Sequence, residues 1–264
     1  MRKKSNLNKN SRLRRGIFLL PNLFTSMNLF CGFYAVIAAI DGKFITAAVA
    51  IIIAGVFDNL DGKIARATRT TSKFGVEYDS LADLVSFGFA PGLMIYLWAL
   101  KPLGRIGWLA AFLFMACGAL RLARFNTQVS SVSSDYFVGL PIPAAAGMSA
   151  VTVLFYHKFS LSPQSSPILI LVMLYALSFL MVSTIKYNSF KKPEFFRTMK
   201  FNVLVACMLI FIFIAAQPSI ALFLFGVSYV GSGPFNTFRH YKKLKQGKTA
   251  SLRAEEQPTN PIKS

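Results

Sequence analysis

Long apolar runs separated by short polar and basic segments make up most of this 264-residue chain. The runs are continuous rather than alternating at every second residue, which favours helices over the strands of a membrane barrel. Eight runs have roughly the 17 to 25 residues that a helix needs to cross a bilayer. Their approximate ranges are 17–40, 44–66, 79–100, 105–125, 141–160, 166–187, 200–216 and 218–238. The pattern predicts an all-α, polytopic membrane protein with about eight transmembrane helices.

The basic residues predict the orientation of these spans. If the chain starts in the cytoplasm and crosses eight times, all but four of its 29 Lys and Arg residues lie on the cytoplasmic side. The four exceptions are Lys43, Lys101, Arg105 and Lys158. Cytoplasmic segments of membrane proteins carry such an excess. We therefore expect a multi-pass protein of the cytoplasmic membrane with both termini in the cytoplasm.

The composition supports the membrane interpretation and excludes other classes. Hydrophobic residues make up 54% of the chain and charged residues only 15%, against about 25% in typical soluble domains. The net charge of +19 is spread over the ends of the predicted spans, so anionic lipid headgroups are the expected partners and nucleic acid is not. Cys31, Cys117 and Cys207 lie within apolar runs and indicate no disulfide framework.

Three regions follow from this organisation. Residues 1–16 form a basic segment that we expect at the membrane interface, residues 17–240 the transmembrane domain, and residues 241–264 a polar tail that we expect to be disordered. The first run follows a basic segment, as in a signal peptide. It is nevertheless longer than the apolar part of one and contains Pro21, Asn22 and Asn28, so we interpret it as a permanent span.

Five of the ten acidic residues lie in one segment, "DNLDGKIARATRTTSKFGVEYDSLAD", residues 58–83. The apolar stretch before Asp58 provides only about 21 Å of helix, less than the roughly 30 Å of a bilayer core. Asp58 and Asp61 must therefore lie near the interface. Asp58 and Asp61 are three residues apart, and Asp79 and Asp83 four, so each pair shares one helix face. The polar turn between the helices can bring all four carboxylates together.

Four adjacent carboxylates repel one another unless a cation neutralises them. Oxygen ligands without nearby His or Cys favour Mg²⁺, Mn²⁺ or Ca²⁺ over zinc. The alternative interpretation is that Asp58 and Asp61 form interfacial ion pairs with Lys63, Arg66 and Arg69. We favour the metal site.

The pattern D-x2-D-G-x2-A-R-x8-G-x3-D-x3-D, from Asp58 to Asp83, resembles the signature of the CDP-alcohol phosphatidyltransferase family at every position. The resemblance implies transfer of a phosphatidyl group from a CDP-linked lipid to an alcohol, with release of CMP. It implies two Mg²⁺ or Mn²⁺ ions at the four carboxylates and Asp83 as the general base. The metal ligands implied are Asp58, Asp61, Asp79 and Asp83, and the residues bordering the CDP moiety are Gly62, Ala65, Arg66 and Gly75.

A polar stripe on the first span adds candidates. Asn22, Thr25 and Asn28 are spaced three residues apart, on the same membrane side as the carboxylates. Such a stripe can serve helix packing alone. We assign Asn22 and Thr25 to binding of the CDP-lipid.

Three further stretches, "PNLFTSMNLFCG", "CGALRLARFN" and "GLPIPAAAG", resemble the membrane-embedded branch of the family that uses serine. This resemblance implies CDP-diacylglycerol and L-serine as substrates and a homodimer in the membrane. The carboxylate of serine needs a cation, for which Arg121, Arg124 and Lys186 are candidates. Glycerol 3-phosphate or inositol phosphate as acceptor remains an alternative. A cation-coupled transporter is another, but the acids lie at one interface and no internal repeat is visible.

Overall fold

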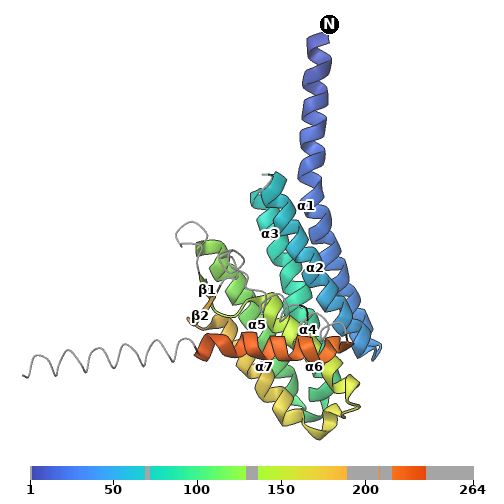
Figure 1. Cartoon of the computed structure of the whole chain (residues 1–264), viewed down its shortest axis with the longest axis vertical. Coiled ribbons are helices and arrows are strands. Elements are labelled where there is room, and N and C mark those ends of the chain that lie inside the picture. Colours follow the sequence, from blue (N-terminus) through green and yellow to red (C-terminus); the bar gives the residue numbers. More distant parts are fainter. Residues whose placement is uncertain (1, 69–71, 129–135, 189–207, 209–215, 236–264) are drawn as a thin grey trace, which may run out of the picture.

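The apolar runs fold into helices in the computed structural model, which describes residues 2–68, 72–128, 136–188, 208 and 216–235. The α-helices are α1 (Arg2–Ile40), α2 (Phe44–Thr68), α3 (Lys73–Asp83), α4 (Ala90–Ile95), α5 (Arg105–Gln128), α6 (Ile142–Lys158) and α7 (Pro167–Val182). A further helix, Pro218–Phe235, is called the C-terminal helix below. Figure 1 shows α1 and α2 side by side, with the first part of α1 extending beyond the other helices.

The third span is continuous from Lys73 to Leu103, although its helical type changes along the way. Two π-helical turns, η1 (Leu84–Phe89) and η2 (Tyr96–Leu100), interrupt the α-helical geometry, and a 3₁₀ turn, η3 (Lys101–Leu103), ends the span. π-helical turns occur frequently at functional sites. Here η1 begins directly after Asp83, so the backbone changes geometry where α3 carries its last carboxylate.

Small side chains allow the first two helices to pack closely. Ala35, Ala38 and Ala39 of α1 are buried in the core, as are Ala47 and Ala54 of α2. Alanines at helix interfaces permit close backbone approach, which is typical of membrane proteins. The packing brings the polar stripe of α1 against the end of α2 that carries Asp61.

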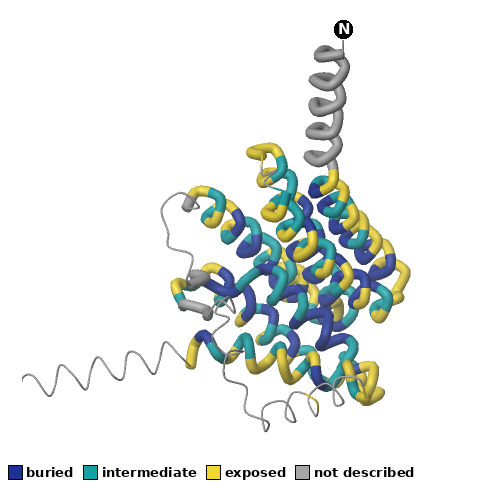
Figure 2. The backbone as a smooth tube through the Cα atoms, turned by 45° about the horizontal axis from the view of Figure 1, so that its top comes forward, coloured by how far each residue is buried: buried dark blue, intermediate teal, exposed yellow. Residues whose placement is uncertain are grey.

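Large apolar side chains cover the outside of the bundle, as lipid contact requires. Phe30 of α1 and Phe179 of α7 are 63% and 66% exposed, respectively. In Figure 2 the exposed positions of the described residues lie on the outer helix faces and the buried ones face the interior. Five helices of the described residues are long and apolar enough to cross a membrane: Leu20–Ile40, Phe44–Thr68, Lys73–Leu103, Arg105–Thr127 and Pro218–Phe235.

The predicted helical membrane architecture is therefore confirmed. The count of eight spans and the cytoplasmic location of the termini stay predictions. Helices α6 and α7 coincide with two of the predicted spans but have only 17 and 16 residues. The predicted span 200–216 lies outside the described residues except for positions 208 and 216, and the tail 241–264 lies outside them entirely. Helix α1 runs from the basic segment 1–16 into the first span without a break.

The end of the sixth predicted span is a local departure from the all-α expectation. Helix α7 stops at Val182, and β2 (Lys186–Asn188) pairs antiparallel with β1 (Tyr136–Val138). Gly139 follows β1 with a φ of 81°, and its backbone N–H donates to the carbonyl of Ile185 at 2.8 Å. A side chain at Gly139 would meet the carbonyl oxygen of Met181, so glycine permits this close approach. Helix α6 then starts after Pro141, as the sequence predicts.

The C-terminal helix packs against α6. The rings of Phe155 and Phe223 are stacked with centroids 4.2 Å apart, and Gly226 lies close to Met148. In Figure 1 this helix is coloured orange and lies beside α6. Its contact with α6 closes one side of a cavity described below.

Candidate active site

Helices α2 and α3 bring acidic side chains together at one end of the bundle. Each of Asp58, Asp61 and Asp79 offers a carboxylate oxygen within 4.8 Å of the others. Asp61 is buried, and Asp58 and Asp79 are half-buried. The Oδ1 atom of Asp79 is buried and has no hydrogen-bond partner among the described residues. Three oxygen donors at this spacing, one of them without a partner, fit a hard divalent cation.

The fourth carboxylate, Asp83, is buried at 8% exposure and lies outside this three-residue group. It remains close enough to Asp58 and Asp79 to interact with both electrostatically. Its Oδ1 accepts a hydrogen bond from the Nδ2 amide of Asn28 at 3.0 Å. The four carboxylates therefore form a cluster of three, with Asp83 beside it as a neighbour that accepts a hydrogen bond from Asn28.

The polar stripe of α1 contacts these carboxylates directly. Thr25 Oγ1 lies 2.9 Å from Asp61 Oδ2 as a hydrogen-bond donor, and both residues are buried. Asn28 donates to Asp83 one turn further along. The stripe that could have served helix packing alone therefore holds the acids in place. The contact between Asn28 and Asp83, 55 residues apart in sequence, was not predicted.

The ion-pair interpretation of Asp58 and Asp61 finds no support in the part of the chain with described side chains. There, neither carboxylate lies within 4.0 Å of the charged group of Lys63 or Arg66, and Arg69 is outside the described residues. Among the described residues, the acidic cluster therefore forms no ion pair with Lys63 or Arg66.

A small pocket of about 160 Å³ lies against the carboxylate cluster. All six residues that the sequence assigned to the CDP-lipid line it: Asn22, Thr25, Gly62, Ala65, Arg66 and Gly75. Asp61 and Asp79 line it as well. The N-cap residue of α3, Ser72, accepts a hydrogen bond from the backbone N–H of Gly75 at 3.0 Å and fixes the start of the helix beside the pocket. A side chain at Gly75 would come within 3.5 Å of Asn22 Oδ1, so glycine keeps this wall open.

The three candidate acceptor cations differ in their surroundings. The guanidinium of Arg121 lies close enough to Asp83 and Tyr229 to interact electrostatically, and its Nε atom is buried without a hydrogen-bond partner among the described residues. Arg124 instead donates from Nη1 to the carbonyl oxygen of Val182 at 3.4 Å. Lys186 belongs to β2, and its side chain is outside the described part.

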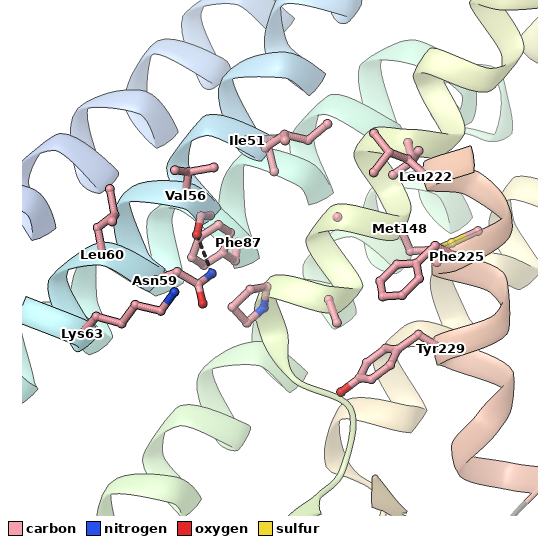
Figure 3. A pocket seen from close by; sticks show the side chains of 17 residues that line it. Ile51, Val56, Asn59, Leu60, Lys63, Phe87, Met148, Leu222, Phe225 and Tyr229 are labelled. Carbon is pink, nitrogen blue, oxygen red and sulfur yellow. Dashed lines mark hydrogen bonds between the residues drawn. The ribbon is translucent and has the colours of Figure 1, made fainter. Parts of the chain in front are cut away.

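A second cavity of about 510 Å³ lies between α2, α6 and the C-terminal helix. Figure 3 shows Asn59, Lys63 and Tyr229 toward one part of it, and Ile51, Leu222 and Met148 toward another. On α2 the cavity is lined by Asn59, the residue after Asp58, although none of the four carboxylates lines it. The sequence did not indicate this cavity, because it depends on the packing of a helix that follows α6 by about 60 residues.

The fold and the site together define a helical membrane protein with a divalent-metal type of carboxylate cluster at one end of its bundle. Residues 18–182 match the family model for CDP-alcohol phosphatidyltransferase, and the chain belongs to this family. The match includes α2 and α3 with all four carboxylates, whereas the C-terminal helix lies beyond it.

Curated relatives extend the similarity over most of the chain. The sequence is 38% identical over 208 residues to a protein of Helicobacter pylori named CDP-diacylglycerol–serine O-phosphatidyltransferase, covering 79% of this chain and 87% of the relative. It is 40% identical over 174 residues to the protein of the same name from Bacillus subtilis, covering 66% of this chain and 92% of that one. An archaetidylserine synthase of Methanothermobacter thermautotrophicus is 37% identical over 170 residues, covering 64% and 69%, respectively.

Proposed function

We propose that this protein transfers the phosphatidyl group of CDP-diacylglycerol to the hydroxyl group of L-serine, giving phosphatidylserine and CMP. One observation carries the proposal. All six residues that the sequence predicted to bind the CDP-lipid line the same pocket, directly beside the carboxylate cluster. The names of the Helicobacter and Bacillus relatives support serine as the acceptor.

In this proposal the pocket beside the cluster binds the CDP portion of the lipid. Asn22 and Thr25 of α1 form one wall, and Arg66 provides a planar set of donors for phosphate oxygens. Asp58, Asp61 and Asp79 would hold Mg²⁺ or Mn²⁺, and Asp83 would complete the ligand set for a second ion. When bound, such ions neutralise charge on the pyrophosphate and on the departing CMP.

Asp83 is the proposed base. The serine hydroxyl loses its proton to the Asp83 carboxylate while its oxygen forms a bond to the phosphorus that carries diacylglycerol. The bond between that phosphorus and the bridging oxygen breaks, and CMP leaves with the electron pair. Phosphoryl transfer depends chiefly on positioning and charge neutralisation, so a carboxylate within hydrogen-bonding reach is sufficient chemistry from the protein.

Arg121 is the proposed binder of the serine carboxylate. Its proximity to Asp83 and its buried Nε, which has no hydrogen-bond partner in the described part of the chain, support this role over Arg124, which is bonded to the end of α7. A single guanidinium suits a carboxylate, because bidentate pairing satisfies both groups. A phosphorylated acceptor would bring more negative charge to the same place.

The larger cavity is the proposed route for the acyl chains. Its apolar part, with Ile51, Met148 and Leu222, suits hydrocarbon, and its lining includes Asn59 and Lys63 of α2, the helix that carries Asp58 and Asp61. The lipid then enters sideways from the membrane while serine arrives from water. We further propose that the site faces the cytoplasm and that the protein forms a homodimer.

The test is CMP release by the purified protein supplied with CDP-diacylglycerol and either Mg²⁺ or Mn²⁺. L-serine, glycerol 3-phosphate and inositol phosphate are added in separate reactions. We expect release that requires both the metal ion and serine. An Asp83→Asn variant should remain folded and inserted but lose turnover, by roughly the 10²- to 10⁴-fold that general acid–base catalysis contributes.

Each other outcome corrects a different part of the proposal. Release that depends on another alcohol keeps the metal-dependent transfer and overturns the acceptor. Turnover by Asp83→Asn at a near-normal rate overturns its assignment as the base. Absence of release with every acceptor contradicts the proposed transfer itself.

A further inference from the structure

Asn28 of α1 makes a direct contact with the carboxylate proposed as the base. Its Nδ2 donates to Asp83 Oδ1 at 3.0 Å, and the two residues are 0% and 8% exposed. The bond links α1 to the third span close to the start of η1. A hydrogen bond to an ionised group is stronger than one between neutral groups, and burial keeps water from competing for it.

Two features of the backbone fix Asn28 in this position. Ser86 Oγ donates to the carbonyl oxygen of Asn28 at 3.0 Å, so the third span holds the main chain of α1 as well as its side chain. One turn further along α1, a Cβ on Gly32 would lie 2.6 Å from the Cα of Ser86. The two helices therefore approach most closely beside this contact, and Asn28 has little freedom to move away from Asp83.

The amide selects how Asp83 is used. Because the Asn28 N–H donates to Oδ1, it holds the plane of the Asp83 carboxylate and so sets the direction of the lone pairs that remain on both oxygens. The same bond restrains rotation of the carboxylate at the end of α3. Holding a reacting group in its productive orientation accounts for a large part of enzymatic rate enhancement.

The other end of the amide supports a functional role. Asn28 Oδ1 is buried and has no hydrogen-bond partner among the described residues. A side chain kept only for packing would leave this acceptor unsatisfied at a cost of roughly 1 to 3 kcal/mol. A buried polar group of this kind needs an explanation, and an amide directed at a reactive carboxylate provides one.

We propose that Asn28 is a positioning residue for the phosphatidyl transfer: its amide orients the Asp83 carboxylate toward the hydroxyl of the acceptor. The inference rests on the proposed function, since it assigns Asn28 to the base of that reaction. It assigns Asn28 no contact with substrate.

Two variants at one position separate orientation from packing. Asn28→Leu keeps approximately the same volume without the amide, and Asn28→Gln keeps the amide with one more methylene in a fully buried place. The kcat of Asn28→Leu should fall roughly 10²-fold, the lower part of the range for acid–base catalysis. Its KM for CDP-diacylglycerol should stay within about threefold of wild type, because Asn28 is not one of the residues that line the proposed CDP-lipid pocket. Asn28→Gln should retain more of the kcat than Asn28→Leu, whatever the order of their melting temperatures.

Ser26→Ala is the matched control. Ser26 lies on the same helix and links α1 to Tyr78 of α3 through a contact of 2.9 Å, but it touches no carboxylate. It should leave kcat near the wild-type value. If kcat across the Asn28 variants follows melting temperature instead of the amide, Asn28 has only a structural role. If Asn28→Leu regains normal kcat at high Mg²⁺, Asn28 supports the metal site and the inference is wrong. Loss of the proposed function is distinguishable, because wild type itself would then release no CMP with serine.

Discussion

Arg121 and Arg124 lie about one turn apart on α5, yet their guanidinium groups have different surroundings. Arg121 lies near Asp83, and its buried Nε has no partner within the segments that the structure describes, whereas Arg124 is bonded to the carbonyl of Val182. Arg121→Gln should therefore raise the KM for serine about 10- to 100-fold, the equivalent of one hydrogen bond to a charged group. The KM for CDP-diacylglycerol should change little.

Arg124→Gln is the comparison variant, and steady-state kinetics with serine varied at saturating lipid is the measurement. Arg124→Gln should raise the KM for serine at least several-fold less than Arg121→Gln does, because the guanidinium of Arg124 contacts the end of α7. A larger effect for Arg124→Gln would assign the acceptor carboxylate to that residue instead.

The sequence predicted those site residues whose positions follow from their spacing along neighbouring helices. Asp58 and Asp61 share one face, and Asp79 returns on the next helix, so a short turn was enough to unite them. The bond between Asn28 and Asp83 depends on how α1 crosses the third span, and no local pattern encodes that crossing. Tyr229 of the C-terminal helix, which lies near the Arg121 guanidinium, was not predicted either, because its position depends on packing between segments far apart in the sequence.

At the scale of elements, the crossing of α1 and η1 has little room for an added side-chain atom. A Cβ on Gly32 would lie 2.6 Å from the Cα of Ser86, and a backbone atom cannot rotate away as a side chain can. Gly32→Ala should separate the two helices and destabilise the protein by about 1 to 3 kcal/mol, the range for overpacking a close contact. Thermal unfolding in detergent measures the change.

Gly231→Ala in the C-terminal helix is the control, because no atom of the residues that the structure describes lies within 4 Å of a Cβ built there. It should leave stability unchanged or raise it by up to about 1 kcal/mol, as alanine favours helix over glycine. Equal melting temperatures for Gly32→Ala and wild type would mean that the crossing is looser than the structure indicates.

The helices themselves were predictable because each requires only a long apolar run. The strands β1 and β2 were not, since three residues carry too little periodicity to distinguish a strand from the end of a helix. The sixth run was therefore assigned to helix up to residue 187, five residues beyond the end of α7 at Val182. The pairing of β2 with β1 and the bond from Gly139 to Ile185 replace that last helical turn.

At the scale of the whole molecule, the two ends of the bundle differ in chemistry. One end carries the acidic cluster and the pocket beside it. The other end carries Lys43 and His157 around a separate hollow lined by Trp98 and Tyr156. Aromatic and basic side chains together are typical of a membrane–water interface. Helix propensity and hydropathy predict the spans, but the cavity closed by the C-terminal helix depends on packing between distant segments.

Labelling of single cysteines tests which end faces the cytoplasm. In a background with Cys31, Cys117 and Cys207 replaced by alanine, Thr127→Cys and Gln164→Cys place a thiol at opposite ends of the bundle, both at exposed positions. Basic residues of the acidic-cluster end should keep that end in the cytoplasm. A membrane-impermeant maleimide should therefore label Gln164→Cys in intact cells, and Thr127→Cys only after permeabilisation. The reverse result would place the carboxylates outside, where serine and CDP-linked lipid made in the cytoplasm could not reach them, and the proposed transfer would lose its substrate supply.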